Sequence, residues 1–240
     1  MNKPLIIAMD FKDRTAAESF LDSLDSFTGT PLFLKVGMEL FYREGPSLVE
    51  AWKEKGHRIF LDLKLHDIPS TVQSAARQLA ALNVDLITVH AAGGIRMMEA
   101  AREGLETGTP AADSVPDCVA VTQLTSTTEK MMQEELGIPA GLEETVIHYA
   151  VNAKQAGLQG IVCSALEAPA IKEHAGRNMK AVTPGIRMKE QDRNDQKRVV
   201  TPAKARNLGS DAIVVGRSIT SAEQPWQTYQ DMMKQWRGKQ

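Results

Sequence analysis

The stretch that decides the fold class is Arg58-Ile-Phe-Leu-Asp-Leu-Lys-Leu-His-Asp-Ile-Pro-Ser-Thr71. Residues 58–64 predict a strand, because the odd-numbered positions are all apolar and successive side chains of a strand point to opposite faces. The apolar face is expected to pack on helices, which leaves Asp62 and Lys64 together on the inward face at the end of the strand. Buried charges need partners, since an unpaired one is costly. The stretch therefore predicts a buried strand that delivers a charged pair to a site.

Short apolar or β-branched runs of the same kind recur along the chain, with amphipathic segments of helical spacing between them. The expected strands cover residues 5–10, 32–37, 58–64, 86–90, 118–124, 160–165, 180–186 and 212–218. The expected helices cover residues 15–26, 45–55, 70–82, 94–106, 142–156, 202–208 and 225–236. Eight strand runs alternating with helices over 240 residues match the size and rhythm of a (β/α)8 TIM barrel, an α/β fold. A doubly wound open sheet is the alternative, and the count of eight favours the barrel.

No shift in composition and no Pro/Gly-rich linker divides the chain, so residues 1–240 are expected to form a single barrel domain. One connection, the polar stretch 187–198, is unusual because it has no apolar period. A solvated surface loop is the ordinary interpretation of such a stretch. Its position after the seventh expected strand also fits a lid or a phosphate contact, which barrel enzymes often place there.

Composition argues against several classes of protein. Apolar residues make up 42% of the sequence and charged residues 24%, the balance of a soluble globular protein. The formal net charge of -2 argues against broad nucleic-acid binding but allows a local cationic pocket. No apolar segment approaches the roughly 18 residues of a membrane span, and the start has no signal-peptide core, so we expect a cytoplasmic protein without a membrane partner. The two cysteines, Cys118 and Cys163, lie in apolar runs and are expected to be reduced core residues.

Charged side chains gather at the C-terminal ends of the expected strands, where a barrel places its active site. They are Asp10, Lys35, Asp62, Lys64, Asp67, His90 and Arg217. An alternating array of Lys35, Asp62, Lys64 and Asp67 would give each charge an opposite neighbour. A single Asp-x-Lys is usually an ordinary ion pair, but four alternating charges at one barrel mouth indicate a functional site.

Residues 62–71 (DLKLHDIPST) resemble the signature of the orotidine 5'-monophosphate decarboxylase family in its bacterial form. Further matches are Asp10 and residues 34–37 (LKVG), 121–126 (VTQLTS), 183–187 (TPGIR), 195–198 (DQKR) and 215–218 (VGRS). These matches extend from the first to the eighth expected strand, so the resemblance covers nearly the whole chain, with no departure at a family site residue. It implies decarboxylation of orotidine 5'-monophosphate to UMP in de novo pyrimidine biosynthesis, with no metal and no other cofactor.

The chemistry of this reaction fits the residue types. Loss of carbon dioxide leaves a carbanion at C6 of the pyrimidine, which an adjacent ammonium group stabilises and then protonates. By resemblance Lys64 is that group, Asp62 and Asp67 are its anionic neighbours, and Lys35 balances the array.

Other residues have implied roles in binding the substrate. The resemblance assigns the ribosyl part to Asp10 and Lys35, the pyrimidine to Thr125 and Pro184, and the phosphate to Arg187, Gln196, Gly216 and Arg217. The last pair is plausible from the residues themselves, because glycine lets the backbone approach an anion and arginine offers a fork for phosphate oxygens.

A homodimer is also implied, in which Asp67, Ile68 and Thr71 reach into the neighbouring subunit's site. Spacing does not decide this, because Asp67 follows Lys64 closely and could also turn back within its own chain.

Three alternatives remain open from the residues. A magnesium-dependent sugar-phosphate decarboxylase of the same superfamily can carry an Asp-x-Lys-x-x-Asp pattern, but residues 68–71 and Gln196 favour the nucleotide enzyme. A metal-dependent pentose-phosphate epimerase would need ligands in the second strand, where this chain has Lys35. His66 and His90 are expected to be hydrogen-bonded packing residues rather than metal ligands. A noncatalytic phosphate-binding barrel is the third alternative, and it leaves the charge array without a use.

Overall fold

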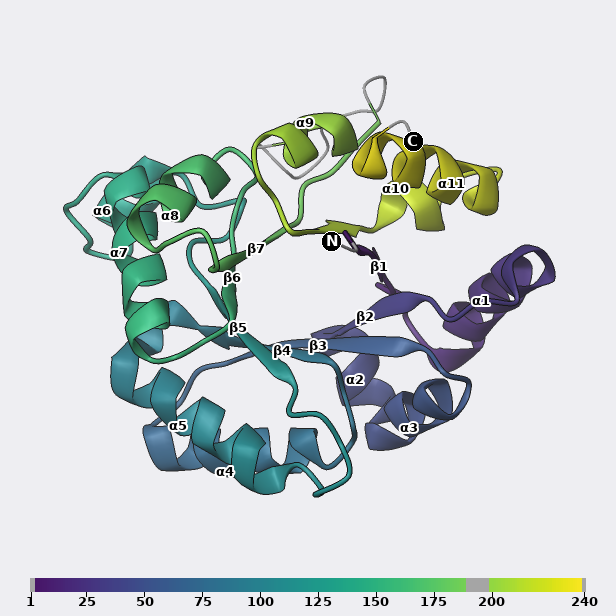
Figure 1. The fold of residues 1–240 in the computed structure, drawn as a ribbon, viewed down its shortest axis with the longest axis horizontal. Helices are drawn as coiled ribbons and strands as arrows, with labels where there is room; N and C mark the ends of the chain where they lie inside the picture. Colours follow the sequence, from purple (N-terminus) through teal and green to yellow (C-terminus); the bar gives the residue numbers. More distant parts are fainter. Residues whose placement is uncertain (1–2, 189–198, 239–240) are drawn as a thin grey trace.

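The eight expected strand runs each contain a strand, and the strands close into a barrel (Figure 1). The computed structural model describes residues 3–188 and 199–238. Neighbouring strands pair in parallel and in sequence order, and β8 pairs with β1 to complete the ring. An open doubly wound sheet would leave two unpaired edges. Closure therefore confirms the (β/α)8 TIM barrel.

The strands lie close to the predicted positions. They are β1 (Leu5–Ala8), β2 (Phe33–Gly37), β3 (Arg58–Leu65), β4 (Leu86–His90), β5 (Asp117–Val121), β6 (Gly160–Val162), β7 (Lys180–Thr183) and β8 (Ala212–Val215). Several strands end two or three residues before the predicted run does, because the last residues of the run leave the ladder and turn to the barrel mouth. Asp10, Leu124 and Pro184 are examples, and all three line the cavity there.

Helices surround the strands on the outside of the barrel (Figure 1). They are α1 (Arg14–Thr28), α2 (Met38–Glu44), α3 (Pro46–Glu54), α4 (Pro69–Ala80), α5 (Gly94–Gly108), α6 (Glu129–Glu134), α7 (Leu142–Gln155), α8 (Ala168–His174), α9 (Pro202–Asn207), α10 (Arg217–Thr220) and α11 (Pro225–Arg237), with a 3-10 turn η1 (Ala91–Gly93). The sequence predicts every one of these helices except α2, α6, α8 and α10. These four have between 4 and 7 residues, which is too short for apolar periodicity to show. Helix α9 is equally short, but Thr201 followed by Pro202 marks its start in the sequence.

Two apolar layers hold the barrel together. The inner layer fills the barrel with alternate residues of the strands, namely Ile6, Ala8, Phe33, Phe60, Leu86, Val119, Val182, Ala212 and Val214. The outer layer lies between strands and helices and includes Trp52 and Trp236, both fully buried. Because apolar side chains fill the lower part of the barrel, the inward-facing charged groups lie above this layer, toward the C-terminal ends of the strands.

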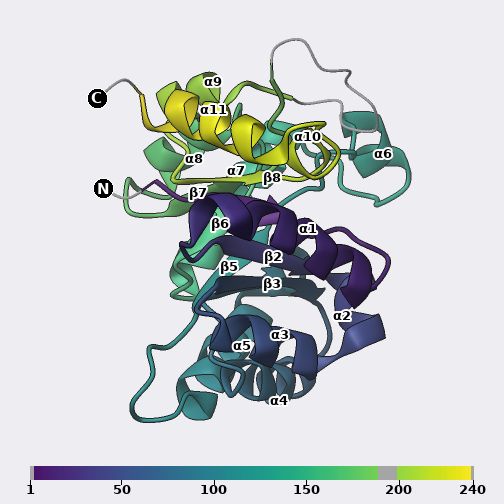
Figure 2. The same cartoon turned by 90° about the vertical axis from the view of Figure 1, so that its right-hand side faces the viewer.

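The last helix, α11, is hydrogen-bonded to the start of the chain, just before β1. The indole N–H of Trp236 in α11 donates to the carbonyl oxygens of Lys3 and Pro4, at 3.0 Å and 3.1 Å. Helices α9 and α11 lie beside β7 and β8, whereas α4 and α5 cover the opposite side of the strands (Figure 2). The C-terminal helix therefore seals the junction where β8 meets β1.

Helices α4 and α5 approach each other closely enough for glycine to be required at the contact. A Cβ atom on Gly104 of α5 would lie 2.2 Å from the carbonyl oxygen of Gln73 in α4. We expect Gly104→Ala to lower the free energy of unfolding by about 1–3 kcal/mol, because the helices must move apart to admit the methyl group. Thermal unfolding measures this as a fall in Tm of roughly 2–4 °C per kcal/mol.

Gly141→Ala, at the start of α7, is the matched control. A Cβ atom there would lie 3.6 Å from its nearest neighbour, a flexible carboxylate oxygen of Glu129, so little must shift. If both variants unfold at the wild-type temperature, the close contact between α4 and α5 does not limit the side chain at position 104.

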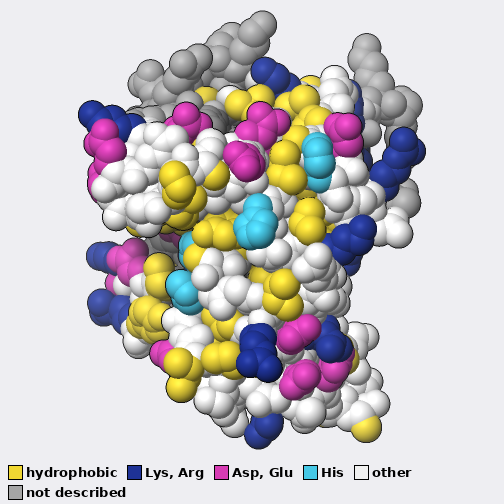
Figure 3. Space-filling model, turned by 90° about the vertical axis from the view of Figure 1, so that its left-hand side faces the viewer, with side chains coloured by type: hydrophobic (Ala, Val, Ile, Leu, Met, Phe, Trp, Pro, Cys, Tyr) yellow, Lys and Arg dark blue, Asp and Glu magenta, His cyan; other side chains and the backbone are white. Residues whose placement is uncertain are grey.

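The surface is mixed in character. On the face where α6, α7 and α8 lie, hydrophobic side chains are interspersed with charged and histidine side chains (Figure 3). Within the described residues, no helix combines the length and the apolar character needed to cross a membrane. Cys118 and Cys163 are both buried and no disulfide joins them, as predicted. Burial raises the pKa of the Cys118 thiol to about 12, which keeps it in the unreactive protonated form.

Candidate active site

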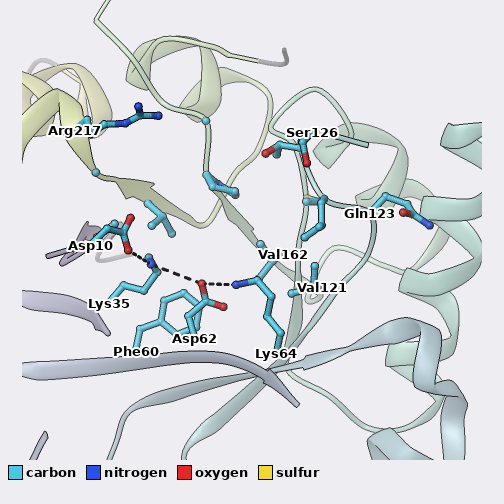
Figure 4. Close-up of a pocket in the computed structure, with 18 of the residues that line it drawn as sticks. Asp10, Lys35, Phe60, Asp62, Lys64, Val121, Gln123, Ser126, Val162 and Arg217 are labelled. Atoms are coloured by element: carbon cyan, nitrogen blue, oxygen red, sulfur yellow. Dashed lines mark hydrogen bonds and ion pairs between the residues drawn. The ribbon is translucent and has the colours of Figure 1, made fainter. Parts of the chain in front are cut away.

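A cavity of about 380 Å³ opens at the C-terminal ends of the strands (Figure 4). This is the end at which barrel enzymes place their catalytic groups. Most of the predicted site residues line it, namely Asp10, Lys35, Asp62, Lys64, Thr125, Pro184, Arg187, Gly216 and Arg217. Residues from β1, β2, β3, β5, β7 and β8, or from the turns that follow them, thus converge on one space.

Four charges form a continuous chain along one wall of this cavity (Figure 4). The ammonium of Lys35 lies 2.8 Å from Asp10 Oδ1 and 3.8 Å from Asp62 Oδ2. The ammonium of Lys64 lies 3.0 Å from the same Asp62 oxygen. Lys35 is only 9% exposed, and these two carboxylates are the opposite charges that lie beside its ammonium group. The order of charges is Asp10, Lys35, Asp62, Lys64, in which every charge has an opposite neighbour.

Asp67, predicted to follow Lys64 in the array, lies elsewhere in this chain. It is exposed, it does not line the cavity, and its Oδ1 accepts a hydrogen bond of 2.7 Å from the backbone N–H of Ile68. Within the part of the chain that the structure describes, no cation pairs with it. Within one chain Asp67 therefore does not join Lys35, Asp62 and Lys64, because the backbone leads away into α4 after Lys64. Asp10 occupies the end of the chain of charges instead. The array of four charges stays a prediction, in which Asp67 comes from the neighbouring subunit.

Ile68 and Thr71 lie near Asp67, outside the cavity of their own chain. Both are exposed at the start of α4, Ile68 to 64%, and neither lines the cavity. An exposed isoleucine beside a site is available for contact with another molecule.

The strand that carries Asp62 and Lys64 is irregular. Leu61 pairs with Ile87 and Leu65 pairs with Val89, so three residues of β3 face a single residue of β4. Lys64 has a φ of 53°, in the left-handed region that residues other than glycine rarely adopt. Alternation along a regular strand correctly predicts that Asp62 and Lys64 lie together. The direction of Lys64, however, depends on this local distortion and not on regular alternation. Such distortions are common next to active sites.

A second wall of the cavity, formed after β7 and β8, carries the residues that were expected to bind phosphate. Gly216 and Arg217 follow β8, and Arg187 follows β7. Because β8 pairs with β1, this wall adjoins the Asp10 end of the charge chain, and a Cβ atom on Gly216 would lie 3.7 Å from Asp10 Oδ2. Arg187 is 8% exposed and its guanidinium donates to the carbonyl oxygen of Ile186 at 2.9 Å. Gln196 lies outside the described residues. Figure 4 shows Arg217 on the side of the cavity where Asp10 lies, away from Lys64.

The base of the polar stretch 187–198 is fixed by a short parallel bridge. The N–H of Arg187 donates to the carbonyl oxygen of Val200, and the N–H of Val200 donates to that of Gly185. Residues 187 and 200, one on each side of the part outside the described residues, thus lie next to each other.

Sequence reasoning missed several residues that line the cavity, among them Phe60, Gln123 and Ser126. Phe60 shares the inward face with Asp62, so strand alternation carries the signal for it. Gln123 is 6% exposed, and a polar residue at the end of an otherwise apolar strand run is the signal that could have found it.

The two histidines near Lys64 stack on each other, with ring centroids 5.4 Å apart and an interplanar angle of 19°. His90 Nδ1 accepts from the backbone N–H of Ala92 at 3.3 Å. Burial lowers the pKa of His90, and the nearby His66 and Lys64 lower it further. The lowered pKa favours the neutral form of His90, whose Nδ1 can accept the bond from Ala92. Among residues 3–188 and 199–238, no three His, Cys, Asp or Glu side chains form a group that could hold a metal ion.

Comparison with known proteins identifies close relatives along the whole chain. The family model of the orotidine 5'-phosphate decarboxylase / HUMPS family matches residues 3–232. An orotidine 5'-phosphate decarboxylase from Geobacillus sp. (strain WCH70) is 56% identical over 240 residues, which is 100% of this chain and 99% of the relative. The enzyme of the same name from Bacillus cytotoxicus is 57% identical over 238 residues, 99% of each protein.

Solved structures agree with these relatives. The crystal structure of orotidine 5'-phosphate decarboxylase from Lactobacillus acidophilus has a TM-score of 0.89 and 40% sequence identity, and covers 99% of this chain and 100% of its own. That of an uncharacterized conserved protein from Geobacillus kaustophilus has a TM-score of 0.86 and 54% identity, with coverage of 97% and 100%. The chain therefore belongs to the orotidine 5'-phosphate decarboxylase / HUMPS family.

Proposed function

We propose that the protein converts orotidine 5'-monophosphate to UMP, a step of de novo pyrimidine biosynthesis, with Lys64 as the catalytic acid. Family membership and relatives named for this activity over their full length support the reaction. The observation that carries the mechanism is the ammonium of Lys64, held 3.0 Å from Asp62 at the wall of the cavity.

Lys64 has two tasks in this proposal. When the bond between C6 and the carboxylate breaks, its electron pair stays on C6, and the adjacent ammonium stabilises that negative charge. The ammonium then gives a proton to C6, which completes UMP and leaves a neutral amine to be reprotonated. Both tasks need a fixed position, and the ion pair to Asp62 supplies it.

Asp62 and Lys35 set the electrostatics around Lys64. Asp62 is the counter-charge of both lysines, at 3.0 Å and 3.8 Å. It also places a negative charge near the substrate's own carboxylate, so that loss of carbon dioxide relieves a repulsion. Lys35 limits this repulsion and, together with Asp10, holds the ribosyl hydroxyls.

The rest of the cavity is assigned to the base and the phosphate. Thr125 hydrogen-bonds the pyrimidine and Pro184 packs against it. The phosphate lies at Gly216, where the backbone can come close, and it is gripped by Arg187 and Arg217 together with Gln196. The phosphate thus contacts the wall formed after β7 and β8, and the scissile carboxylate lies toward Asp62 and Lys64.

A homodimer completes the site in this proposal. Asp67, Ile68 and Thr71 are exposed at the start of α4 and do not line their own chain's cavity, so they are free to enter the cavity of a second subunit. The partner's Asp67 would then supply the second anionic neighbour of Lys64, which this chain's own Asp67 does not provide.

The decisive test is an absorbance assay of purified protein with orotidine 5'-monophosphate in excess chelator. We expect loss of orotidylate absorbance at a rate that added magnesium does not change. A strict requirement for magnesium would favour a sugar-phosphate decarboxylase of the same superfamily. Binding of UMP without any turnover would favour a noncatalytic phosphate-binding barrel.

Arg217 gives a prediction for the phosphate wall. Arg217→Ala removes a bidentate contact, so we expect KM for orotidine 5'-monophosphate to rise about 10–100-fold. With the phosphate-free substrate orotidine, added phosphite should accelerate the wild-type enzyme, and the variant should need a much higher phosphite concentration. Steady-state kinetics with both substrates measure these changes.

Arg177→Ala is the matched control, because Arg177 is an exposed arginine at the other end of the barrel. It should leave both kinetic constants unchanged. A fall in kcat of Arg217→Ala with KM and phosphite dependence unaltered would contradict a role in phosphate binding.

A further inference from the structure

Thr88, in the middle of β4, contacts both ends of the distorted segment of β3. It is completely buried and lies on the inward face of its strand, below the wall that carries the charge chain. It does not line the cavity, so it has no access to a bound substrate. Any part that it plays in the reaction must therefore act through its neighbours.

The register of the sheet explains why a hydroxyl is needed at this point. Between the pairs Leu61–Ile87 and Leu65–Val89, residues 62–64 face Thr88 alone. The regular ladder is interrupted there, and the backbone N–H of Lys64 donates instead to Thr88 Oγ1 at 2.9 Å. The side chain of Thr88 thus replaces a missing backbone partner.

The same hydroxyl also donates a hydrogen bond to Asp62. Thr88 Oγ1 donates to Asp62 Oδ1 at 2.9 Å, while Asp62 Oδ2 faces the ammonium groups of Lys64 and Lys35. One carboxylate oxygen is therefore fixed from below and the other points to the two lysines. A hydroxyl has one proton to donate and lone pairs that accept. Thr88 can therefore donate a hydrogen bond to Asp62 and accept one from the backbone N–H of Lys64 at the same time.

The bond to Lys64 also stabilises an unfavourable backbone conformation. The left-handed region is strained for a residue other than glycine, and Lys64 has a φ of 53°. Such a conformation persists only where the surroundings hold it in place. Thr88 is the side chain that contacts this peptide unit and the neighbouring carboxylate together.

We infer that Thr88 is a positioning residue, whose single hydroxyl fixes both the left-handed backbone of Lys64 and the orientation of the Asp62 carboxylate. The kinetic part of this inference rests on the proposed decarboxylation. Its structural part does not, because it concerns only the geometry of this chain.

Thr88→Val tests the inference, since valine has nearly the shape of threonine and lacks both hydrogen bonds. We expect kcat to fall about 10–100-fold, the effect of a small misplacement of catalytic groups. KM should change less than about threefold, because the phosphate wall is untouched. Thr88→Ser keeps the hydroxyl and should restore kcat to within about threefold of the wild type. Should the valine variant fail to fold, Thr88→Cys replaces it, because a thiol is a weak donor and acceptor.

Thr145→Val is the matched control. Thr145 is 4% exposed in α7, and its hydroxyl donates to the carbonyl oxygen of Gly141 at 2.9 Å, away from the cavity. This variant should lose some stability and keep its kcat. If Thr145→Val loses as much stability as Thr88→Val and its kcat falls equally, the loss of activity comes from lower stability, and the inference is overturned.

Crystal structures of the Thr88 variants give a readout that does not depend on activity. In Thr88→Val we expect Lys64 to leave the left-handed region or the Asp62 carboxylate to rotate, and in Thr88→Ser neither change. Wild-type kcat or unchanged geometry in Thr88→Val would overturn the inference, as would an equal loss in Thr88→Ser. A wild-type protein that does not decarboxylate orotidylate would instead overturn the proposed function and leave the crystallographic test intact.

Discussion

Lys64→Ala should lower kcat for orotidine 5'-monophosphate by at least about 10⁴-fold while the barrel stays folded. The variant loses the proton donor and the nearest positive charge at once, and each effect alone is worth roughly 10²–10⁴-fold. The fold should survive because Lys64 lies at the cavity wall, where its side chain is 28% exposed, and not in either apolar layer. Single-turnover kinetics and circular dichroism measure the two expectations.

Lys53→Ala is the matched control, because it shows what the loss of an ion-paired lysine outside the cavity does. Lys53 is also half-buried and ion-paired, 2.9 Å from Asp85, at the opposite end of β3. Its removal should reduce stability and leave kcat unchanged. Near-normal turnover by Lys64→Ala, in protein shown to be free of wild-type enzyme, would refute the proposed role of Lys64.

Mixing two inactive variants should restore activity if the site is shared between subunits. When Lys64→Ala and Asp67→Asn subunits are refolded together, each heterodimer contains one site with both defects and one with neither. Random pairing gives about a quarter of the wild-type activity, since half of the dimers are mixed and half of their sites are intact. When subunits with different affinity tags are used to isolate the heterodimer, the expected activity rises to about half of the wild-type value, since one of its two sites is intact.

The control for this experiment is a mixture of Lys64→Ala with Asp62→Asn. Asp62 and Lys64 belong to the same cavity of one chain, so every site of that heterodimer keeps one defect and no activity should return. Absence of recovery in the first mixture, with heterodimers verified, would count against a contribution of Asp67 to the neighbouring site.

The sequence predicts the barrel well because its signal is repeated. Each strand run is short, apolar and followed by a helical segment, and eight such units leave few other arrangements. The short helices α2, α6, α8 and α10 escape prediction because a turn or two of helix has no period to detect. Helices of this length depend on tertiary contacts for their stability.

The candidate site divides in a similar way. Alternation along β3 is enough to predict the inward direction of Asp62, but the direction of Lys64 depends on the distorted segment that follows. The irregular register between β3 and β4 depends on how two distant strands fit together, so no local pattern reports it. Thr88 illustrates the consequence, since in sequence it is one more β-branched residue of a strand, and only the register shows its hydroxyl facing Lys64 and Asp62.

The seal between the last helix and the first strand has a consequence for biosynthesis. β1 pairs with β8, and Trp236 donates to the backbone of Lys3 and Pro4, more than 230 positions earlier in the chain. While the ribosome is still translating, one edge of β1 therefore has no partner, and unpaired strand edges are prone to aggregation. The barrel becomes safe from this hazard only when the final segment has emerged, so a nascent chain that stalls before α11 is a natural client for chaperones.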